Sequence, residues 1–228
     1  SALWMVLVCL VSLTGHGGLM LWRGLAAVMA LAAVVLEILW GHGNNQVSPG
    51  AWLNGVKESA DGGGRRSKAQ AALIAFIITM VLIQAGRMNI ELDYDSLHYG
   101  LRSAYVLDNG KGIYENLGMI NLVYTYSKGL EVLVLPLSGT PTYGFVLAFS
   151  LWCTMGILLL AANIVGRYCG REKGIWAAAV LAAIPGIMNM AATAKSDNIT
   201  LLHQLIIYDF ICFALCEGRQ GKGCGPAG

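Results

Sequence analysis

Charged residues are scarce in this chain. Only 12% of its 228 residues are Asp, Glu, Lys or Arg, whereas soluble domains carry about 25%. The formal net charge is +2, which gives no electrostatic field that would attract nucleic acid. Hydrophobic residues make up 56% of the chain, and the mean hydropathy is +0.61. The composition therefore excludes a cytosolic enzyme, a disordered tail and a nucleic-acid-binding module, and it indicates a membrane protein with several spans.

Metal-binding patterns are also missing. The sequence has no CxxC pair and no His/Cys cluster with the spacing of a zinc site. Four of the six cysteines lie inside apolar runs, namely Cys9, Cys153, Cys212 and Cys216. We therefore expect thiols in the core or facing lipid rather than a disulfide framework.

Long apolar segments predict an all-α fold, a polytopic bundle of transmembrane helices with interfacial helices in a large outer loop. A hydrocarbon layer about 30 Å thick needs about 20 apolar residues in a helix. Segment 2–13 is shorter, and we expect either a truncated span or a signal-like stretch. The pair Pro185-Gly186 interrupts another segment. The predicted spans after the first segment are 19–40, 69–86, 143–166, 174–190 and 198–216.

The distribution of Lys and Arg predicts how these spans are oriented. Alternation of the helices puts three basic clusters on one side, which we expect to be cytoplasmic, so the outer loop 87–141 and the short loop 191–197 share the opposite side. Residues 1–68 then form the N-terminal spans and an inner loop, residues 69–216 the membrane core, and residues 217–228 a flexible, Gly-rich inner tail. The clusters are Arg65, Arg66 and Lys68; Arg167, Arg171 and Lys173; and Arg219 and Lys222.

Three carboxylates gather at the start of the outer loop. Glu91, Asp93 and Asp95 lie within five residues, and the amphipathic pattern of 94–108 predicts a helix lying flat in the membrane interface. One interpretation is that an Asp caps this helix. The other is that the carboxylates form a general base or a cation site, because one cap needs only one Asp.

Two lysines lie on the same predicted side. Lys128 belongs to the apolar segment 117–138, for which we expect a partly re-entrant or surface-buried helix rather than a span. Its side chain either snorkels to the surface or supplies a fixed positive charge in a polar pocket. Lys195 precedes Ser196 and Asp197, which either cap the last span or, with Lys195 and free backbone N–H groups, favour a bound phosphate.

Ionisable residues inside the spans are interpreted as structural. Asp209 lies near the inner end of the last span, and Glu37 near the inner end of the second. Because charged side chains are costly in lipid, we expect Asp209 and His203 to face other helices. The sequon at Asn198 lies too close to a span to be a convincing glycosylation acceptor.

Several short motifs resemble the GT-C glycosyltransferases, in particular the branch of protein O-mannosyltransferases and lipid A aminoarabinose transferases. They are Asp95-Ser96-Leu97-His98-Tyr99, Asn109-Gly110-Lys111-Gly112-Ile113-Tyr114 and Lys128-Gly129-Leu130, followed on a later outer loop by Lys195-Ser196-Asp197-Asn198. The resemblance covers about residues 70–216, and Ser96 stands where the family often has Glu. It implies either the N-terminal portion of such an enzyme or a reduced variant that needs a partner.

The resemblance implies an integral membrane enzyme that transfers a sugar from a polyprenyl-phosphate donor to a glycan, lipid or protein acceptor, with inversion at the anomeric carbon. Its active site would face the extracytoplasmic side of a membrane, expected to be a bacterial plasma membrane. Asp95, supported by Asp93, is the implied base. The implied substrate-binding residues are Lys128, Lys195, Asp197, Arg102 and Tyr99.

Alternative interpretations remain open for the role of Asp197 and for the function of the chain. Asp197 either orients Lys195 or helps to hold a divalent cation, in which case Asp93 and Asp95 are the other implied ligands. A transporter or flippase of lipid-linked substrates is a second hypothesis, since His203, Asp209 and the helix break would suit a site at the membrane midplane. A non-catalytic membrane assembly subunit is the third.

Overall fold

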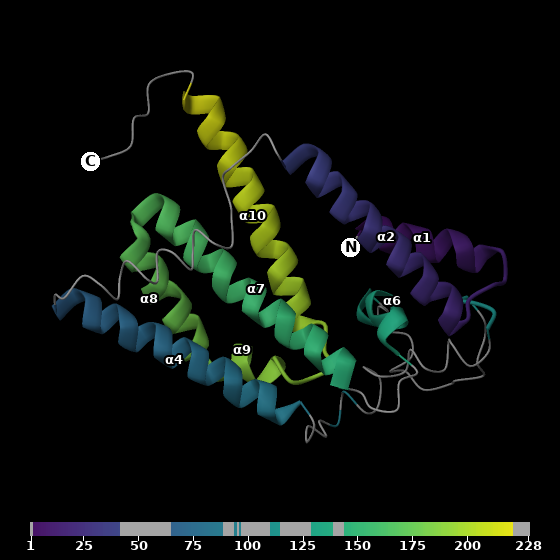
Figure 1. Cartoon of the computed structure of the whole chain (residues 1–228), viewed down its shortest axis with the longest axis horizontal. Helices are drawn as coiled ribbons and strands as arrows, with labels where there is room; N and C mark the ends of the chain where they lie inside the picture. Colours follow the sequence, from purple (N-terminus) through teal and green to yellow (C-terminus); the bar gives the residue numbers. More distant parts are fainter. Residues whose placement is uncertain are drawn as a thin grey trace.

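The computed structural model describes residues 2–41, 65–88, 94, 96, 110–114, 129–138 and 144–220. Secondary structure within these residues is helical, without a strand, which confirms the predicted all-α class. Figure 1 shows the helices in the order α1 (Ala2–Leu13), α2 (Leu19–Gly41), α4 (Arg65–Arg87), α6 (Gly129–Val134), the 3-10 helix η3 (Leu135–Leu137), α7 (Gly144–Cys169), α8 (Arg171–Ala182), α9 (Pro185–Met190) and α10 (Asp197–Gln220).

Among the described helices, α2, α4, α7 and α10 are long and apolar enough to cross a membrane. They coincide with the predicted spans 19–40, 69–86, 143–166 and 198–216, and they indicate an integral membrane protein. α1 has 12 residues, which rise about 18 Å at about 1.5 Å per residue and fall short of the hydrocarbon layer.

α7 is the central helix of a bundle that it forms with α4, α8 and α10. Half of its span is buried, and α8 turns back along it after the single residue Gly170. Gly170 has a φ of +92°, a backbone conformation that suits glycine. At Gly174 the two backbones approach so closely that a Cβ would overlap the carbonyl oxygen of Ala162. Small residues therefore allow the close packing of α7 on α8.

The helix after α7 is broken, as the pair Pro185-Gly186 predicts. α8 ends at Ala182, Ile184 is extended with φ −79° and ψ 111°, and Pro185 begins α9. The residue before a proline avoids the helical conformation, so the break has a local cause. The predicted span 174–190 thus consists of two helices, neither of which has the length of a span.

Two ionisable side chains of α10 have observed partners: Asp209 is paired with another helix, whereas the observed contact of His203 is with its own helix and not, as expected, with another one. Nη1 of Arg167 on α7 lies 3.1 Å from Oδ1 of Asp209 on α10. Asp209 therefore faces another helix, as expected. Nδ1 of His203 lies 2.7 Å from the carbonyl oxygen of Ile199, one turn earlier in α10. The side chain of Glu37 lies outside the described part of the chain.

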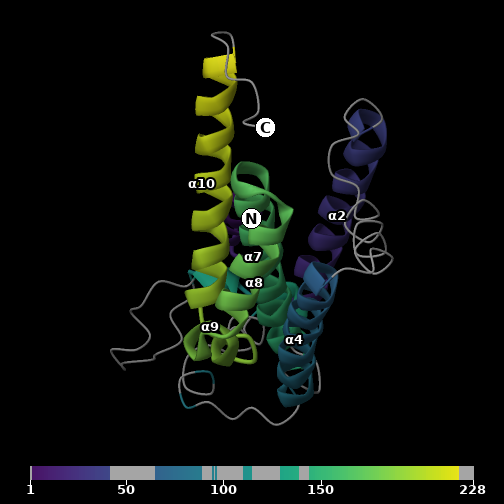
Figure 2. The same cartoon turned by 90° about the vertical axis from the view of Figure 1, so that its left-hand side faces the viewer.

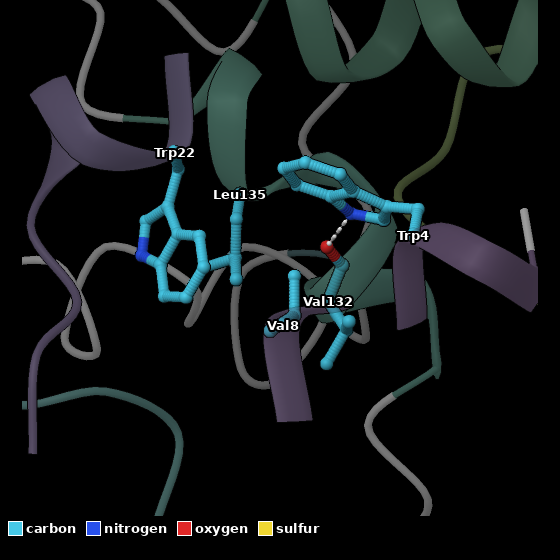
Figure 3. Close-up of a cluster of buried hydrophobic side chains, with 5 residues drawn as sticks. All are labelled: Trp4, Val8, Trp22, Val132 and Leu135. Atoms are coloured by element: carbon cyan, nitrogen blue, oxygen red, sulfur yellow. Dashed lines mark hydrogen bonds between the residues drawn. The ribbon is translucent and has the colours of Figure 1, made fainter. Parts of the chain in front are cut away.

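An apolar cluster joins the N-terminal helices to α6 and η3, as Figure 3 shows. The rings of Trp4 and Trp22 meet edge to face with their centroids 6.3 Å apart. The indole N–H of Trp4 also donates a hydrogen bond of 2.8 Å to the carbonyl oxygen of Val132. Figure 1 shows α1 and α2 on one side of the molecule and α4 and α8 on the other. α6 contacts α1, η3 contacts α2, and the other face of α6 packs against the start of α7. The buried members of the cluster are Trp4, Val8, Trp22, Val132 and Leu135.

The directions of the helices define two ends of the bundle. Arg87 at the end of α4 binds Asn189 in α9, and α8 folds back on α7, so the helices that begin at Arg65 and Arg171 start at the same end. Two of the predicted basic clusters therefore lie at one end. Figure 2 shows α9 at one end and the C-terminal part of α10 at the other. We call the end with α9 and the loop 191–197 the outer end.

Candidate functional site

Ser96 joins the large outer loop to the loop before α10. Its hydroxyl oxygen accepts a hydrogen bond of 2.9 Å from the backbone N–H of Ala194, and both residues are buried. The two residues are 98 positions apart in the sequence. Because Ser96 follows Asp95 and Ala194 precedes Lys195, this bond connects the segment of the implied base with the segment of an implied phosphate ligand.

α6 brings a third segment to the same point. Its residues Leu130 and Val134, one helical turn apart, pack against Ala194 and the first turn of α7. Lys128 immediately precedes this helix in the sequence. The three segments that the sequence analysis associates with the site therefore meet around Ala194.

The opposite face of α6 is held by the N-terminal helices. Val132 packs with Trp4 and Val8 of α1, and Leu135 of η3 packs in the same cluster. Glu131, which lies between Leu130 and Val132 in the sequence, is buried as well. α6 is therefore fixed from two sides, by the N-terminal helices and by the loop 191–197.

The outer loop also contacts the turn between α1 and α2. The N–H of Gly17 donates to the carbonyl oxygen of Gly110 at 2.8 Å, and the N–H of Ile113 donates to Oγ of Ser12 at 3.2 Å. A Cβ on Gly17 would overlap Gly112, which itself has a φ of +100°. The close approach of the two turns thus depends on glycine. It ties a motif of the outer loop to helices that precede the predicted membrane core.

Two more contacts fix the N-terminal helices to the outer segments. Nε of Arg23, the fifth residue of α2, donates to the carbonyl oxygen of Pro136 at 3.1 Å. A hydrogen bond with the thiol of Cys9 raises the pKa of the Tyr114 hydroxyl, which places Tyr114 beside α1. The two N-terminal helices are therefore part of the structure that surrounds the outer site.

Polar side chains also connect α4 to α9 at the outer end. Nη1 of Arg87 donates to Oε1 of Gln84 at 2.9 Å and to Oδ1 of Asn189 at 3.0 Å. Gln84 is buried, although only 6% of the apolar stretch of α4 is buried inside the protein. This network fixes α9 against α4, directly before the chain enters the loop 191–197.

Asn198 makes a second polar network on the other side of α9. Its side-chain amide donates to Oγ1 of Thr154 at 2.7 Å and to the carbonyl oxygen of Ile187 at 2.9 Å. The residue is buried, so its nitrogen is not presented to an enzyme that would glycosylate it. This agrees with the expectation that the sequon is not an acceptor.

Only some of the predicted site residues fall within the described part of the chain. Lys195 is half-buried, and Asp197, the first residue of α10, is exposed. The carbonyl oxygen of Ser196 accepts the N–H of Thr200, so Ser196 holds the N-cap position. The predicted site residues that lie outside the described part are Asp93, Asp95, Tyr99, Arg102 and Lys128.

The described residues include no group of three His, Cys, Asp or Glu side chains that could hold a metal ion. Of the three implied metal ligands, Asp197 alone belongs to this part of the chain. Asp209 and His203, on which the transport hypothesis rests, contact Arg167 and a carbonyl group of α10 respectively. Their observed contacts are those of residues that join or stabilise helices.

Several residues around the site were not recognised from the sequence. Arg87 is the first residue of the predicted outer loop 87–141, and Trp4 belongs to the short apolar segment 2–13. Thr154 interrupts the run 143–166 without a charge. A buried polar group in a membrane helix requires a partner, which is the one signal that could have pointed to Thr154 and Asn198.

We compared the whole chain with protein-family models, with curated proteins and with solved structures, and none of them matches it.

Proposed function

We propose that the chain is a membrane glycosyltransferase, or part of one, that transfers a sugar from a polyprenyl-phosphate donor to an acceptor at the outer end of the bundle. The observation that carries the proposal is the hydrogen bond between the Ala194 N–H and the Ser96 hydroxyl. It joins two segments that follow each other in the same order in the GT-C motifs. The packing of α6 on Ala194 adds the segment that follows Lys128.

The proposed reaction needs a base and an anion-binding group. The acceptor hydroxyl attacks the anomeric carbon while its proton passes to a carboxylate, and the bond from that carbon to the phosphate oxygen breaks. Polyprenyl phosphate leaves with the negative charge, which a lysine and the free amides of a helix N-terminus stabilise. We assign the base to Asp95, with Asp93 in support, and the phosphate to Lys195 and the first turn of α10. One displacement of this kind inverts the anomeric centre.

The remaining assignments concern the donor and its location. Four apolar helices hold the chain in the same bilayer as a lipid-linked donor, whose head group then lies at the outer end. We assign this end to the extracytoplasmic face, following the rule that basic loops stay inside. Lys128, Arg102 and Tyr99 are proposed to contact the phospho-sugar, and Asp197 to orient Lys195 or to bind a divalent cation.

The proposal is tested with the purified protein in proteoliposomes, given a panel of polyprenyl-phosphate sugars and a membrane extract as the source of acceptors. Asp95→Asn is expected to lower the release of polyprenyl phosphate by about 10²- to 10⁴-fold, because a carboxamide cannot take the proton. Glu172→Gln, on α8 at the inner end, is the matched control and is expected to keep full turnover. Equal turnover by Asp95→Asn and the control would remove Asp95 from the role of base, and no release from any donor would contradict the function itself.

A further inference from the structure

The end of α9 leaves a backbone acceptor, the carbonyl oxygen of Ile187, without a helical partner at the outer end. α9 has six residues, and the N–H of Ala191 donates to the carbonyl oxygen of Met188 at 3.2 Å, not to that of Ile187. An unsatisfied carbonyl is costly where there is no water. The amide nitrogen of Asn198 supplies the missing hydrogen bond to Ile187, at 2.9 Å.

The same nitrogen also binds α7. Asn198 donates to Oγ1 of Thr154 at 2.7 Å, and the hydroxyl of Thr154 donates in turn to the carbonyl oxygen of Ser150 at 3.0 Å. The side chains of all three residues are at least 96% buried. A primary amide has two N–H hydrogens, and here each has its own acceptor. Asn198 therefore fixes the first turn of α10 to α7 and to α9 at the same time.

This connection determines where the loop 191–197 lies. Only six residues, 191–196, separate the end of α9 from the start of α10, and Asn198 is the second residue of α10. Four consecutive residues, Ala191 to Ala194, are buried, so the loop is packed rather than exposed. Any shift of the first turn of α10 would move Ala194 away from Ser96, and Lys195 would move together with Ala194.

We propose that Asn198 is a positioning residue of the outer site, which sets the loop 191–197 so that Ala194 meets Ser96 and Lys195 faces the substrate. The effect on catalysis rests on the proposed function, whereas the placement of the loop does not. Asn198 acts through the backbone of the loop and makes no contact with the reacting atoms.

The placement is tested by cross-linking, with cysteines introduced at Ser96 and Ala194 and the joined peptides measured by mass spectrometry in intact membranes. Adding Asn198→Ala is expected to lower the yield of the cross-link by about tenfold, because two buried hydrogen bonds are lost. Adding Gln204→Ala, an exposed amide on the same helix, is expected to leave the yield unchanged. An equal yield in both backgrounds would overturn the proposal.

The catalytic consequence is tested by steady-state kinetics on single and double variants. Asn198→Ala is expected to lower kcat by about tenfold and to change the KM for the donor by less than about twofold. Combining Asn198→Ala with Lys195→Ala should lower kcat little further, since both changes remove the contribution of a correctly placed Lys195. Fully additive losses in kcat would overturn the assignment.

Two conservative variants of Thr154 distinguish the loss of the hydrogen bond from a general loss of folding. Thr154→Ser keeps the hydroxyl that accepts from Asn198, whereas Thr154→Val removes it at similar size. The cross-link and kcat should be retained in the first and lowered in the second, and equal values in both would overturn the proposal. If wild type releases no polyprenyl phosphate but the cross-link still depends on Asn198, the proposed function fails and the placement of the loop stands.

Discussion

Single small residues set how closely the helices of this protein approach one another. A Cβ on Gly174 would overlap the carbonyl oxygen of Ala162 and would lie 3.1 Å from the backbone of Gly166. Rigid backbone atoms cannot move aside as the end of a flexible side chain can. A Cβ on Gly24 in α2 would meet no atom within 4 Å. The two glycines therefore have different roles, although both lie inside apolar helices.

Gly174→Ala is expected to lower the free energy of unfolding in detergent micelles by about 1–3 kcal/mol, because α8 must move away from α7. Gly24→Ala is the control and should be neutral or stabilising by up to about 1 kcal/mol, since alanine is the better helix former. Denaturant titration followed by circular dichroism measures both. Equal stability of the two variants would contradict the close packing of α7 and α8.

Helices and turns of the N-terminal part are connected to the outer loop by several hydrogen bonds. Trp4 binds α6, Arg23 binds Pro136, and the turn at Gly17 binds Gly110. The GT-C resemblance does not include these helices, yet they contact two of the segments that carry its motifs. They are therefore expected to affect the stability of the outer site.

Trp4→Phe keeps most of the ring but leaves the carbonyl oxygen of Val132 without its donor. The loss of a buried hydrogen bond is expected to lower the free energy of unfolding by about 1–2 kcal/mol. Trp152→Phe, at a position that is 69% exposed on α7, serves as the control and should change it by less than about 0.5 kcal/mol. A larger effect at Trp152 than at Trp4 would argue against the observed contact of α1 with α6.

The ion pair between Arg167 and Asp209 joins α7 to α10. Arg167→Asp places two carboxylates side by side at partly exposed positions and is expected to lower the free energy of unfolding by about 1 kcal/mol. The exchange of both residues, Arg167→Asp with Asp209→Arg, should recover part of that loss. Melting temperatures of the purified variants give the comparison, and a double variant no more stable than the single one would contradict a direct pair.

At the scale of the whole molecule, the chain has two ends of different character. Basic residues mark the start of α4 and the end of α7 at one end of the bundle, and the outer loops meet at the other end. By the positive-inside rule we expect the basic end to lie in the cytoplasm. That assignment decides which compartment supplies the substrates of the proposed reaction.

The orientation is tested with a membrane-impermeant maleimide on intact cells. A cysteine introduced by Lys111→Cys, at an exposed position beside the turn at Gly17, is expected to react from outside. Native Cys169, exposed at the end of α7, should react only after the membrane is permeabilised, and peptide mapping distinguishes the two thiols. Labelling of Cys169 in sealed cells would reverse the topology.

The sequence by itself determined the all-α class, four of the five predicted long apolar helices and the break at Pro185, because hydropathy and the restriction before proline are local properties. It also predicted the segment 174–190 as a span, which the structure divides into two short helices. It also indicated which loops share a side, through the positions of Lys and Arg. Only the tertiary structure decided that Ser96 meets Ala194, that Asn198 joins α7, α9 and α10, and that α6 lies between two apolar clusters. These contacts connect residues tens of positions apart, and no periodicity or propensity within a segment encodes the partner at such a distance.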